Sequence, residues 1–282
     1  IQNVRYDSVR VLIKEGIGFI NYTGHGSATS WLGTGINSSF PDQMTNESRY
    51  PLVISNACLT AKFDDNNCIG SAMVRAVDKG ALAFIGCTND SYWAEDYYWS
   101  VGAGAFVDDP SYEETGLGFY DRLFHLNGEK PSDWYTTAGQ ILYGGNLGVS
   151  ASTSPRKQYY WENYVLLGDP SLSPYIGDPE IMDDPVPDKI PPALKKLNIS
   201  TTPFAYLGLS HADTLWDATH STPTGTAYLD IPDSGKDSCT LVISRQNAIP
   251  LIKTIYFEES DTAWLSINDA VISDSARNAN GK

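Results

Sequence analysis

The segment Pro51–Cys58 (PLVISNAC) is an apolar run of strand length that ends directly in a cysteine. A second such segment, Gly18–Gly26 (GFINYTGHG), ends in a histidine between two glycines. Short apolar runs of this kind are typical of buried strands. If the two strands are parallel neighbours, about 4.8 Å apart, the groups that follow their carboxyl ends lie within reach of one another. The pattern therefore predicts that His25 and Cys58 meet at one edge of a sheet.

The first 176 residues alternate between strand and helix patterns. Together with the two runs above, the apolar patterns give three strands and two helices in the order helix, strand, strand, helix, strand. This order favours an α/β domain with a mainly parallel sheet flanked by helices. The predicted helices are Val4–Leu12 and Ile69–Val77, and the predicted strands are Ile17–Tyr22, Pro51–Ser55 and Ala81–Ile85.

The texture of the sequence changes after residue 176. Residues 177–194 are rich in proline and acidic residues, which indicates an extended linker. Residues 195–260 are rich in Ser and Thr and hold short strand patterns separated by turns, which predicts an all-β immunoglobulin-like sandwich. Residues 261–282 are predicted to begin a further module or to form a tail. The predicted strands are Lys196–Thr201, Gly225–Ile231, Cys239–Ser244 and Ile252–Phe257.

The composition is that of a globular protein with a strongly acidic surface. The 282 residues are 41% hydrophobic and 19% charged, with a formal net charge of −15. Because such a surface repels phosphates and anionic lipid, we expect no nucleic acid and no membrane insertion, and a basic substrate suits it. The apolar runs are far shorter than a membrane span. The chain begins at Ile1 rather than Met, which indicates a mature or excised piece.

Of the four cysteines, Cys58 is the candidate for a catalytic role. Four cysteines are too few for a disulfide framework, and none has the CxxC or Cys/His spacing of a metal site. Cys239 stands alone in its region and is predicted to be a small buried side chain. A cysteine after an apolar strand is ordinarily a core residue. Its pairing with the His–Gly pattern is much rarer and favours a catalytic role for Cys58.

The chemistry of a Cys/His pair suits peptide hydrolysis. A free thiol is mostly protonated at neutral pH, and a neighbouring imidazolium favours the nucleophilic thiolate. The imidazole of His25 then donates a proton to the departing amine. The backbone N–H groups of Gly26 and Cys58 are predicted to form the oxyanion hole, an arrangement worth about 3–4 kcal/mol per donor. No cofactor is expected for this chemistry.

Four segments resemble counterparts in the caspase-like cysteine peptidases and, more closely, in the gingipain family, peptidase family C25. The resemblance covers Glu15–Tyr175, continues weakly through Leu241–Ile255, and is closest to the lysine-specific members. It implies a caspase-like fold and a secreted or surface-exposed bacterial cysteine endopeptidase with Cys58 as nucleophile and His25 as general acid. The segments are Asn21–Trp31 (NYTGHGSATSW), Asn56–Asp64 (NACLTAKFD), Asn89–Ala105 (NDSYWAEDYYWSVGAGA) and Asn163–Leu172 (NYVLLGDPSL).

The resemblance also implies a substrate pocket. Asp96 matches an acid beneath the P1 side chain, and Trp93 matches a wall of the pocket. The other implied substrate-binding residues are Thr23, Asn56 and Tyr92. Because a lysine stem can lie along an indole while its ammonium needs a carboxylate, we predict cleavage after Lys and, less efficiently, after Arg.

Two readings of Glu95 remain open beside Asp96. It is either an alternative partner for the P1 ammonium or half of a solvated acidic pair on a loop. Leu166–Pro170 (LLGDP) is predicted to be a structural strand exit.

In the lysine-specific members an acid orients the histidine, and its counterpart would lie upstream of Ile1. The resemblance therefore implies that an upstream fragment of the same precursor completes the fold. A terminus at Lys282 is the product a lysine-specific peptidase would leave, so autoprocessing there is a hypothesis. Structural calcium is also implied by the resemblance. Asp64, Asp65 and Asn66 are candidate ligands without EF-hand spacing, and a solvated acidic loop is favoured for them.

Two other functions are alternatives to this one. Peptidases of the same family remove secretion signals in a sortase-like manner in type IX secretion, and they would not need an acid at Asp96. A non-catalytic adhesin or carbohydrate-binding fragment would use the 12% of aromatic residues, but it would not need an intact Cys/His pair.

Overall fold

The computed structural model describes residues 6–232 and 236–258. The chain divides into two compact units, Ile1–Pro179 and Glu180–Lys282. Within the described ranges, no helix is long and apolar enough to cross a membrane.

The first unit is built on a four-stranded sheet with the order β1-β4-β5-β6. The pairs β1/β4 and β4/β5 are parallel, and β6 joins the edge of β5 antiparallel. The prediction of a mainly parallel sheet is confirmed, as is the strand that ends at the LLGDP segment. The strands are β1 (Phe19–Thr23), β4 (Leu52–Asn56), β5 (Ala83–Cys87) and β6 (Tyr164–Gly168).

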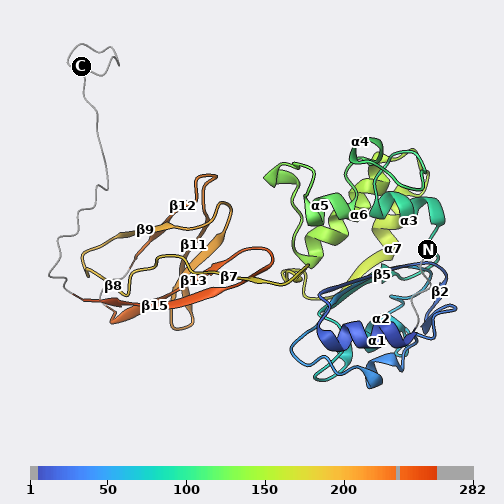
Figure 1. Ribbon diagram of the computed structural model, residues 1–282, viewed down its shortest axis with the longest axis horizontal. Coiled ribbons are helices and arrows are strands. Elements are labelled where there is room, and N and C mark those ends of the chain that lie inside the picture. The colour runs from blue at the N-terminus through green and yellow to red at the C-terminus, as the bar shows by residue number, and fades with distance from the viewer. Residues whose placement is uncertain (1–5, 233–235, 259–282) are drawn as a thin grey trace, which may run out of the picture. The chain divides into compact units, whose positions relative to one another are not determined.

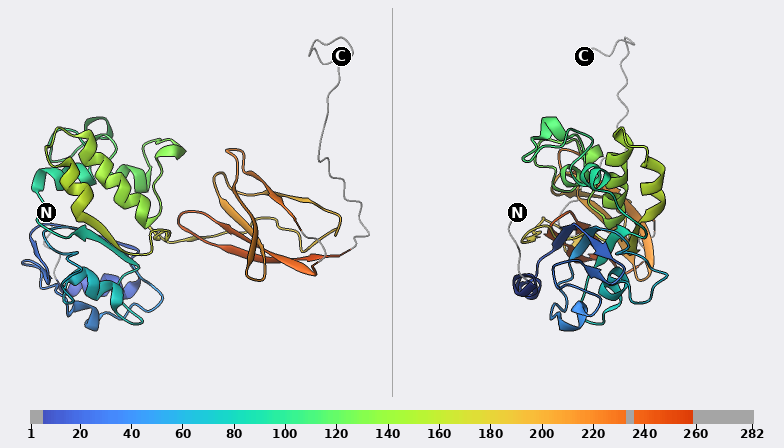
Figure 2. Two further views of the ribbon diagram at one scale, coloured as in Figure 1. Left: turned by 180° about the vertical axis from the view of Figure 1, so that it is seen from behind. Right: turned by 90° about the vertical axis from the view of Figure 1, so that its right-hand side faces the viewer.

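Helices cover both faces of this sheet (Figures 1 and 2). Successive side chains of a strand point to opposite faces, so each strand serves two cores. Leu52 and Ile54 pack with Trp99 in one core, while Val53 packs with Met73 in the other. The first core includes side chains from α3 (Trp93–Ser100), α5 (Phe119–Phe124), α6 (Ala138–Ala151) and α7 (Lys157–Asn163), and the second from α1 (Tyr6–Glu15) and α2 (Ile69–Arg75).

Shorter elements complete the first unit. A small hairpin follows β1, two 3-10 turns lie in the connections, and a one-turn helix precedes α5. These elements are β2 (Gly26–Ser27), β3 (Ser30–Trp31), η1 (Phe40–Gln43), α4 (Tyr112–Thr115) and η2 (Pro131–Asp133).

The described part of the second unit is all β. A five-stranded sheet has the order β11-β10-β13-β15-β8, and β9 pairs with β12. Both contribute to one core, in which the alternating residues Cys239, Leu241 and Ile243 are buried. Cys239 is thus the buried side chain that was predicted. The strands are β8 (Lys189–Ile190), β9 (Lys196–Ser200), β10 (Tyr206–His211), β11 (Thr214–His220), β12 (Thr226–Asp230), β13 (Ser238–Ser244) and β15 (Leu251–Phe257).

The predicted linker, residues 177–194, contributes short strands to the second unit. β7 (Glu180–Ile181) pairs with β14 (Ala248–Ile249), and β8 pairs with the end of β15. Ile190 lies in the core because this proline-rich stretch is extended and its backbone can join a sheet edge. The immunoglobulin-like assignment and the domain boundaries stay predictions. The predicted tail at residues 261–282, including Lys282, lies outside the described residues.

Candidate active site

The structure places the histidine and cysteine segments at one edge of the sheet. Thr23, the last residue of β1, is paired with Asn56, the last residue of β4. The pairing continues past the strands, because the N–H of Gly24 donates a hydrogen bond to the Asn56 carbonyl at 3.1 Å. His25 and Cys58 therefore both follow the carboxyl ends of neighbouring parallel strands, as the sequence predicted.

The loop that carries His25 is held in place from two sides. The carbonyl of His25 accepts hydrogen bonds from the Tyr22 hydroxyl at 2.8 Å and from the Leu32 N–H at 2.9 Å. The ring of Tyr22 stacks on Trp31 with 4.6 Å between centroids. These contacts fix the backbone while the His25 side chain remains exposed.

Gly26 brings this loop against the cysteine. A Cβ atom added at Gly26 would lie 2.8 Å from the carbonyl oxygen of Cys58 and 2.9 Å from the Cβ of Ala57. Real Cβ atoms do not approach backbone oxygen so closely, so this position accepts glycine alone without a shift of the backbone. The close packing brings the residue after His25 next to the backbone of Cys58. The oxyanion-hole role of the Gly26 and Cys58 N–H groups stays a prediction.

Cys58 sits at a tight turn. Leu59, the next residue, has a φ of 65°, a left-handed conformation that is unfavourable for a leucine. The N–H of Leu59 donates to the Asn89 carbonyl at 2.8 Å, which holds the turn. The Cys58 Sγ accepts a hydrogen bond from the N–H of Ser91 at 3.4 Å. The same sulfur lies 3.7 Å from the Ser91 carbonyl oxygen, to which the thiol can donate.

The other cysteines are suited to packing. Cys58 is partly exposed, while Cys68, Cys87 and Cys239 are buried, and all four are free thiols. Burial raises the pKa of the Cys87 thiol to about 12 and that of the Cys239 thiol to about 11. Both are therefore neutral thiols at physiological pH, and Cys58 is the cysteine accessible for chemistry.

Ser91 connects Asp96 with Cys58, because it contacts both residues. The Ser91 backbone contacts the sulfur, and its hydroxyl donates to Asp96 Oδ2 at 2.8 Å. The other carboxylate oxygen, Oδ1, accepts from the Tyr160 hydroxyl at 2.8 Å and the Tyr164 hydroxyl at 2.5 Å. Asp96 is 5% exposed, and this burial raises the pKa of its carboxyl, although the three hydroxyls act in the opposite direction.

Asn56 and Thr23 belong to the same polar network. The Asn56 amide donates to the Ser100 hydroxyl at 2.6 Å and lies 3.5 Å from the Thr23 hydroxyl. The Tyr164 hydroxyl lies 3.2 Å from the Asn56 amide oxygen, which connects this pair with Asp96. The structure thus brings together three of the predicted substrate-binding residues, with Asn56 fully buried and Thr23 at the exposed end.

Trp93 and Tyr92 lie at the start of α3. The indole of Trp93 is 76% exposed. It borders an apolar pocket of about 440 Å³, and Asp96 does not line that pocket. The ring of Tyr92 lies 3.9 Å from the guanidinium of Arg156, a cation–π contact. The pocket is lined by Trp93, Ala94, Tyr97, Phe106, Val107 and Asp108.

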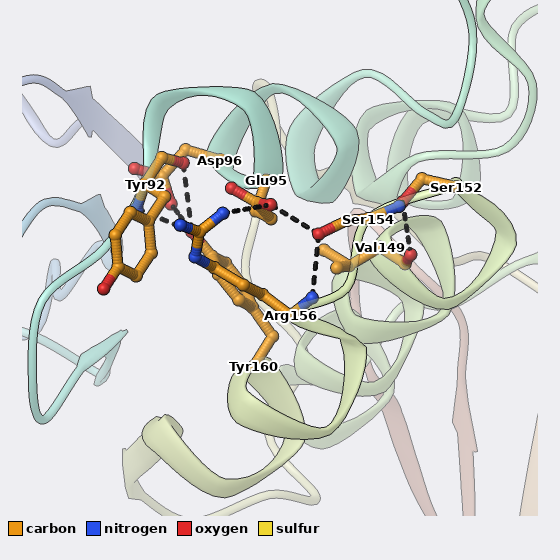
Figure 3. Close-up of polar contacts among 8 residues, drawn as sticks. All are labelled: Tyr92, Glu95, Asp96, Val149, Ser152, Ser154, Arg156 and Tyr160. Atoms are coloured by element: carbon orange, nitrogen blue, oxygen red, sulfur yellow. Dashed lines mark hydrogen bonds and ion pairs between the residues drawn. The ribbon is translucent and has the colours of Figure 1, made fainter.

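Glu95 is neither solvated nor on a loop, so that reading was wrong. It lies in α3 and is 3% exposed. Its Oε1 forms an ion pair with Arg156 at 3.3 Å and accepts a hydrogen bond from Ser154 (Figure 3). A buried carboxylate is tolerated when it is paired in this way. Glu95 therefore ties α3 to the segment before α7.

Several residues of this network, Ser100 and Ser154 among them, were not predicted from the sequence. Tyr160 and Tyr164 are four residues apart across the α7–β6 boundary, a spacing that places two side chains on one side of a helix end. Ser91 and Arg156 had no pattern that could have marked them. The missed residues reach the site from distant segments, since 68 residues separate Tyr164 from Asp96 in the chain.

Structural calcium at Asp64, Asp65 and Asn66 stays a prediction. The Asp65 carboxylate accepts a hydrogen bond from the N–H of Asn67 at 2.9 Å, as in an Asx turn. Within residues 6–232 and 236–258, no group of three or more His, Cys, Asp or Glu side chains could hold a metal ion.

Comparisons with known proteins identify relatives of both the sequence and the fold. The model of peptidase family C25 matches residues 2–175. Lys-gingipain HG66 of Porphyromonas gingivalis is 36% identical over 255 residues, which cover 86% of this chain but 14% of the relative. Gingipain R1 of the same species is 23% identical over 247 residues. This chain thus corresponds to a small part of the relatives' length.

Solved structures of peptidases are also similar to this chain. A structure described as that of a protease has a TM-score of 0.78 and 34% identity, over 89% of this chain and 56% of that chain. The crystal structure of the Arg-specific cysteine proteinase gingipain R has a TM-score of 0.75 at 22% identity, over 90% of this chain and 56% of its own. The second likeness is evidence for the fold.

Proposed function

The chain belongs to peptidase family C25, and on that premise we propose that it forms the catalytic part of a cysteine endopeptidase. Cys58 is the nucleophile, and His25 is the general acid and base. The position of the two residues after neighbouring strands supports these roles, as does the close approach of Gly26 to Cys58.

The reaction proceeds in two halves. The Cys58 thiolate attacks the carbonyl carbon of the scissile peptide, and the oxygen becomes an oxyanion facing the Gly26 and Cys58 N–H groups. The tetrahedral intermediate collapses, the C–N bond breaks, and protonated His25 gives its proton to the departing amine. Neutral His25 then takes a proton from water, whose hydroxide attacks the thioester and releases the acid product and the thiolate.

We propose that the P1 residue is lysine. The contacts of Ser91 with Cys58 and with Asp96 support this proposal. Ser91 contacts both the Cys58 sulfur and the Asp96 carboxylate, so a P1 side chain that leaves the acyl carbon can end beside Asp96. Glu95 is paired with the cationic Arg156, whereas the hydrogen-bond donors to the Asp96 carboxylate are neutral hydroxyls, so Asp96 is the acid we assign to the ammonium. The relatives named Lys-gingipain are also more similar to this chain than those named gingipain R, at 36% against 23% identity.

The proposal extends to the setting of the enzyme. A secreted or cell-surface location and an upstream fragment of the same precursor as partner accord with the family. One solved relative is a complex of gingipain pro- and mature domains. The all-β unit is proposed to be an immunoglobulin-like module that accompanies the catalytic unit, because its strands form sheets around a single core.

A matched peptide panel tests this function. Fluorogenic peptides that differ only in P1, as Lys, Arg or Ala, are assayed with the chain and its upstream precursor segment. We expect kcat/KM in the order Lys, Arg, Ala. Equal turnover of the Ala peptide would favour the sortase-like alternative, and no turnover of any peptide would favour a non-catalytic adhesin.

A further inference from the structure

The hydrogen bonds to Asp96 are distributed unevenly between its two oxygens. Oδ1 accepts from two hydroxyls, those of Tyr160 and Tyr164, whereas Oδ2 accepts from the Ser91 hydroxyl alone. A carboxylate offers about four acceptor positions, two on each oxygen. The protein therefore fills Oδ1 and leaves one position, on Oδ2, which is the oxygen that faces Ser91 and hence Cys58.

The filled side is rigid. The Tyr160 hydroxyl also accepts a hydrogen bond from the Tyr92 N–H at 2.9 Å, so its own proton points to an acceptor. Of its two acceptors, the carboxylate at 2.8 Å is nearer than the Tyr92 carbonyl at 3.1 Å, and it is charged. The ring of Tyr164 stacks between Tyr160, at 4.9 Å, and Trp99, at 5.3 Å. All three rings are buried, so these hydroxyls cannot swing away when a ligand enters.

We propose that Tyr160 and Tyr164 are specificity-determining residues, which keep Asp96 a one-point acceptor and thereby set the preference for lysine over arginine at P1. The inference rests on the proposed function. An ammonium is a compact point charge that can pair with a single carboxylate oxygen, and Oδ2 has an open position for it. A guanidinium pairs best by two parallel N–H···O bonds, one to each carboxylate oxygen. With Oδ1 filled, this fork cannot form.

In this proposal Asp96 and the two tyrosines have different roles. Asp96 supplies the charge that any basic side chain needs, and the two tyrosines decide which basic side chain uses it best. Removing a tyrosine hydroxyl frees a position on Oδ1 while the ring and the stack are kept. Arginine gains its second hydrogen bond, and lysine gains nothing.

The test compares Tyr160→Phe and Tyr164→Phe with wild type on a P1-Lys and a P1-Arg peptide of otherwise identical sequence. We expect each substitution to lower the Lys/Arg ratio of kcat/KM by about 5–10-fold, mainly through tighter use of arginine. A general loss of packing would lower both values by one factor and leave the ratio unchanged. Tyr159→Phe is the matched control, because that hydroxyl donates to the Asp90 carbonyl at 2.9 Å instead.

A second readout needs no turnover. In a Cys58→Ala background, calorimetry gives the ratio of dissociation constants for the same two peptides, and this ratio is expected to shift in the same direction. If wild type prefers lysine and neither Phe variant changes either ratio, the proposed function stands and the role of the tyrosines is wrong. If wild type neither cleaves nor binds either peptide, both proposals are wrong.

Discussion

The two units of this chain bury different kinds of side chain. In the described part of the all-β unit, Ser221 is the one buried polar residue, and the core is otherwise made of aliphatic, aromatic and sulfur-containing residues. The α/β unit buries many more polar and charged groups. Several of them lie around the carboxyl edge of its sheet, namely Asn56, Glu95, Asp96, Ser100 and Ser154.

This difference separates a scaffold from a site. A buried polar group costs free energy unless hydrogen bonds compensate it, so a gathering of such groups at one edge of a sheet marks a candidate site. In the α/β unit, Ser91, Tyr160 and Tyr164 satisfy the carboxylate of Asp96. In the all-β unit, simple alternation along β13 suffices to build the core. Chemistry should therefore depend on the first unit, and mutations in the second should act on stability alone.

Replacing the nucleophile gives the largest expected effect. Cys58→Ala removes the atom that forms the acyl-enzyme, so kcat/KM for a lysine peptide should fall by about 10⁴-fold or more. The matched control is Cys239→Ala in the all-β unit, which should keep wild-type turnover at a temperature where the protein is folded. An equal fall of kcat/KM in both variants would contradict the assignment of the chemistry to the α/β unit.

Removing the charge of Asp96 comes next. Asp96→Asn keeps the shape of the side chain but removes the partner of the ammonium, so kcat/KM for the lysine peptide should fall by about 10²-fold. Turnover of the P1-Ala peptide serves as the internal control and should change little. A loss shared equally by all peptides would show that Asp96 supports the fold rather than the pocket.

The raised pKa of Asp96 predicts a pH dependence of both activity and stability. Cleavage after lysine should decline with acidification at a higher pH than an ordinary aspartate would give, because protonated Asp96 cannot pair with the ammonium. A folded-state pKa above the unfolded one gives stability that is present at low pH and lost as the pH rises through the folded value. Asp96→Asn should therefore melt at or above the wild-type temperature at pH 7. A melting temperature well below wild type would contradict this account of the burial.

A core mutation in the all-β unit should act on stability alone. Leu241 is fully buried, so Leu241→Ala should cost about 2–5 kcal/mol in the free energy of unfolding of that unit. Its control is Leu215→Ala in the same unit, at a side chain that is 63% exposed, where the change should be within about 0.5 kcal/mol. Denaturant melts measure both, while kcat/KM below the transition should match wild type.

The smallest effect concerns Asp121, a partly buried acid of the α/β unit outside the site. Burial and the neighbouring Glu129 raise the pKa of Asp121 to about 6. Its contribution to stability is present below its unfolded pKa and lost as the pH rises through about 6. Asp121→Asn should thus raise the melting temperature at pH 7 by a few degrees and leave it unchanged at pH 3.5. Circular dichroism melts at both pH values check this, and a lower melting temperature at pH 7 would contradict it.

The elements that could be predicted from the sequence are those with a local pattern. The apolar runs before His25 and Cys58 marked two parallel strands and the edge at which they meet. The β10–β11 hairpin was missed because its alternation is masked by Gly208, Ser210 and the polar residues of β11. Strands of two residues, such as β7 and β8, are too short to carry a pattern.

The ligands of Asp96 could not be predicted for a different reason. Tyr160 and Tyr164 reach it from segments that lie 64 and 68 residues away along the chain. Such contacts are made by tertiary packing, which a single sequence does not display. The pairing of Glu95 with Arg156 spans 61 residues and escaped the sequence in the same way.

Active-site labelling tests the central claim most directly. The chain, with its upstream precursor segment present, is treated with a lysyl chloromethyl ketone and mapped by mass spectrometry. We predict one covalent adduct on Cys58, formed faster than with the arginyl homologue, suppressed by a P1-Lys peptide and absent from Cys58→Ala. The absence of any adduct, or an adduct on Cys68, Cys87 or Cys239 instead of Cys58, would contradict the account.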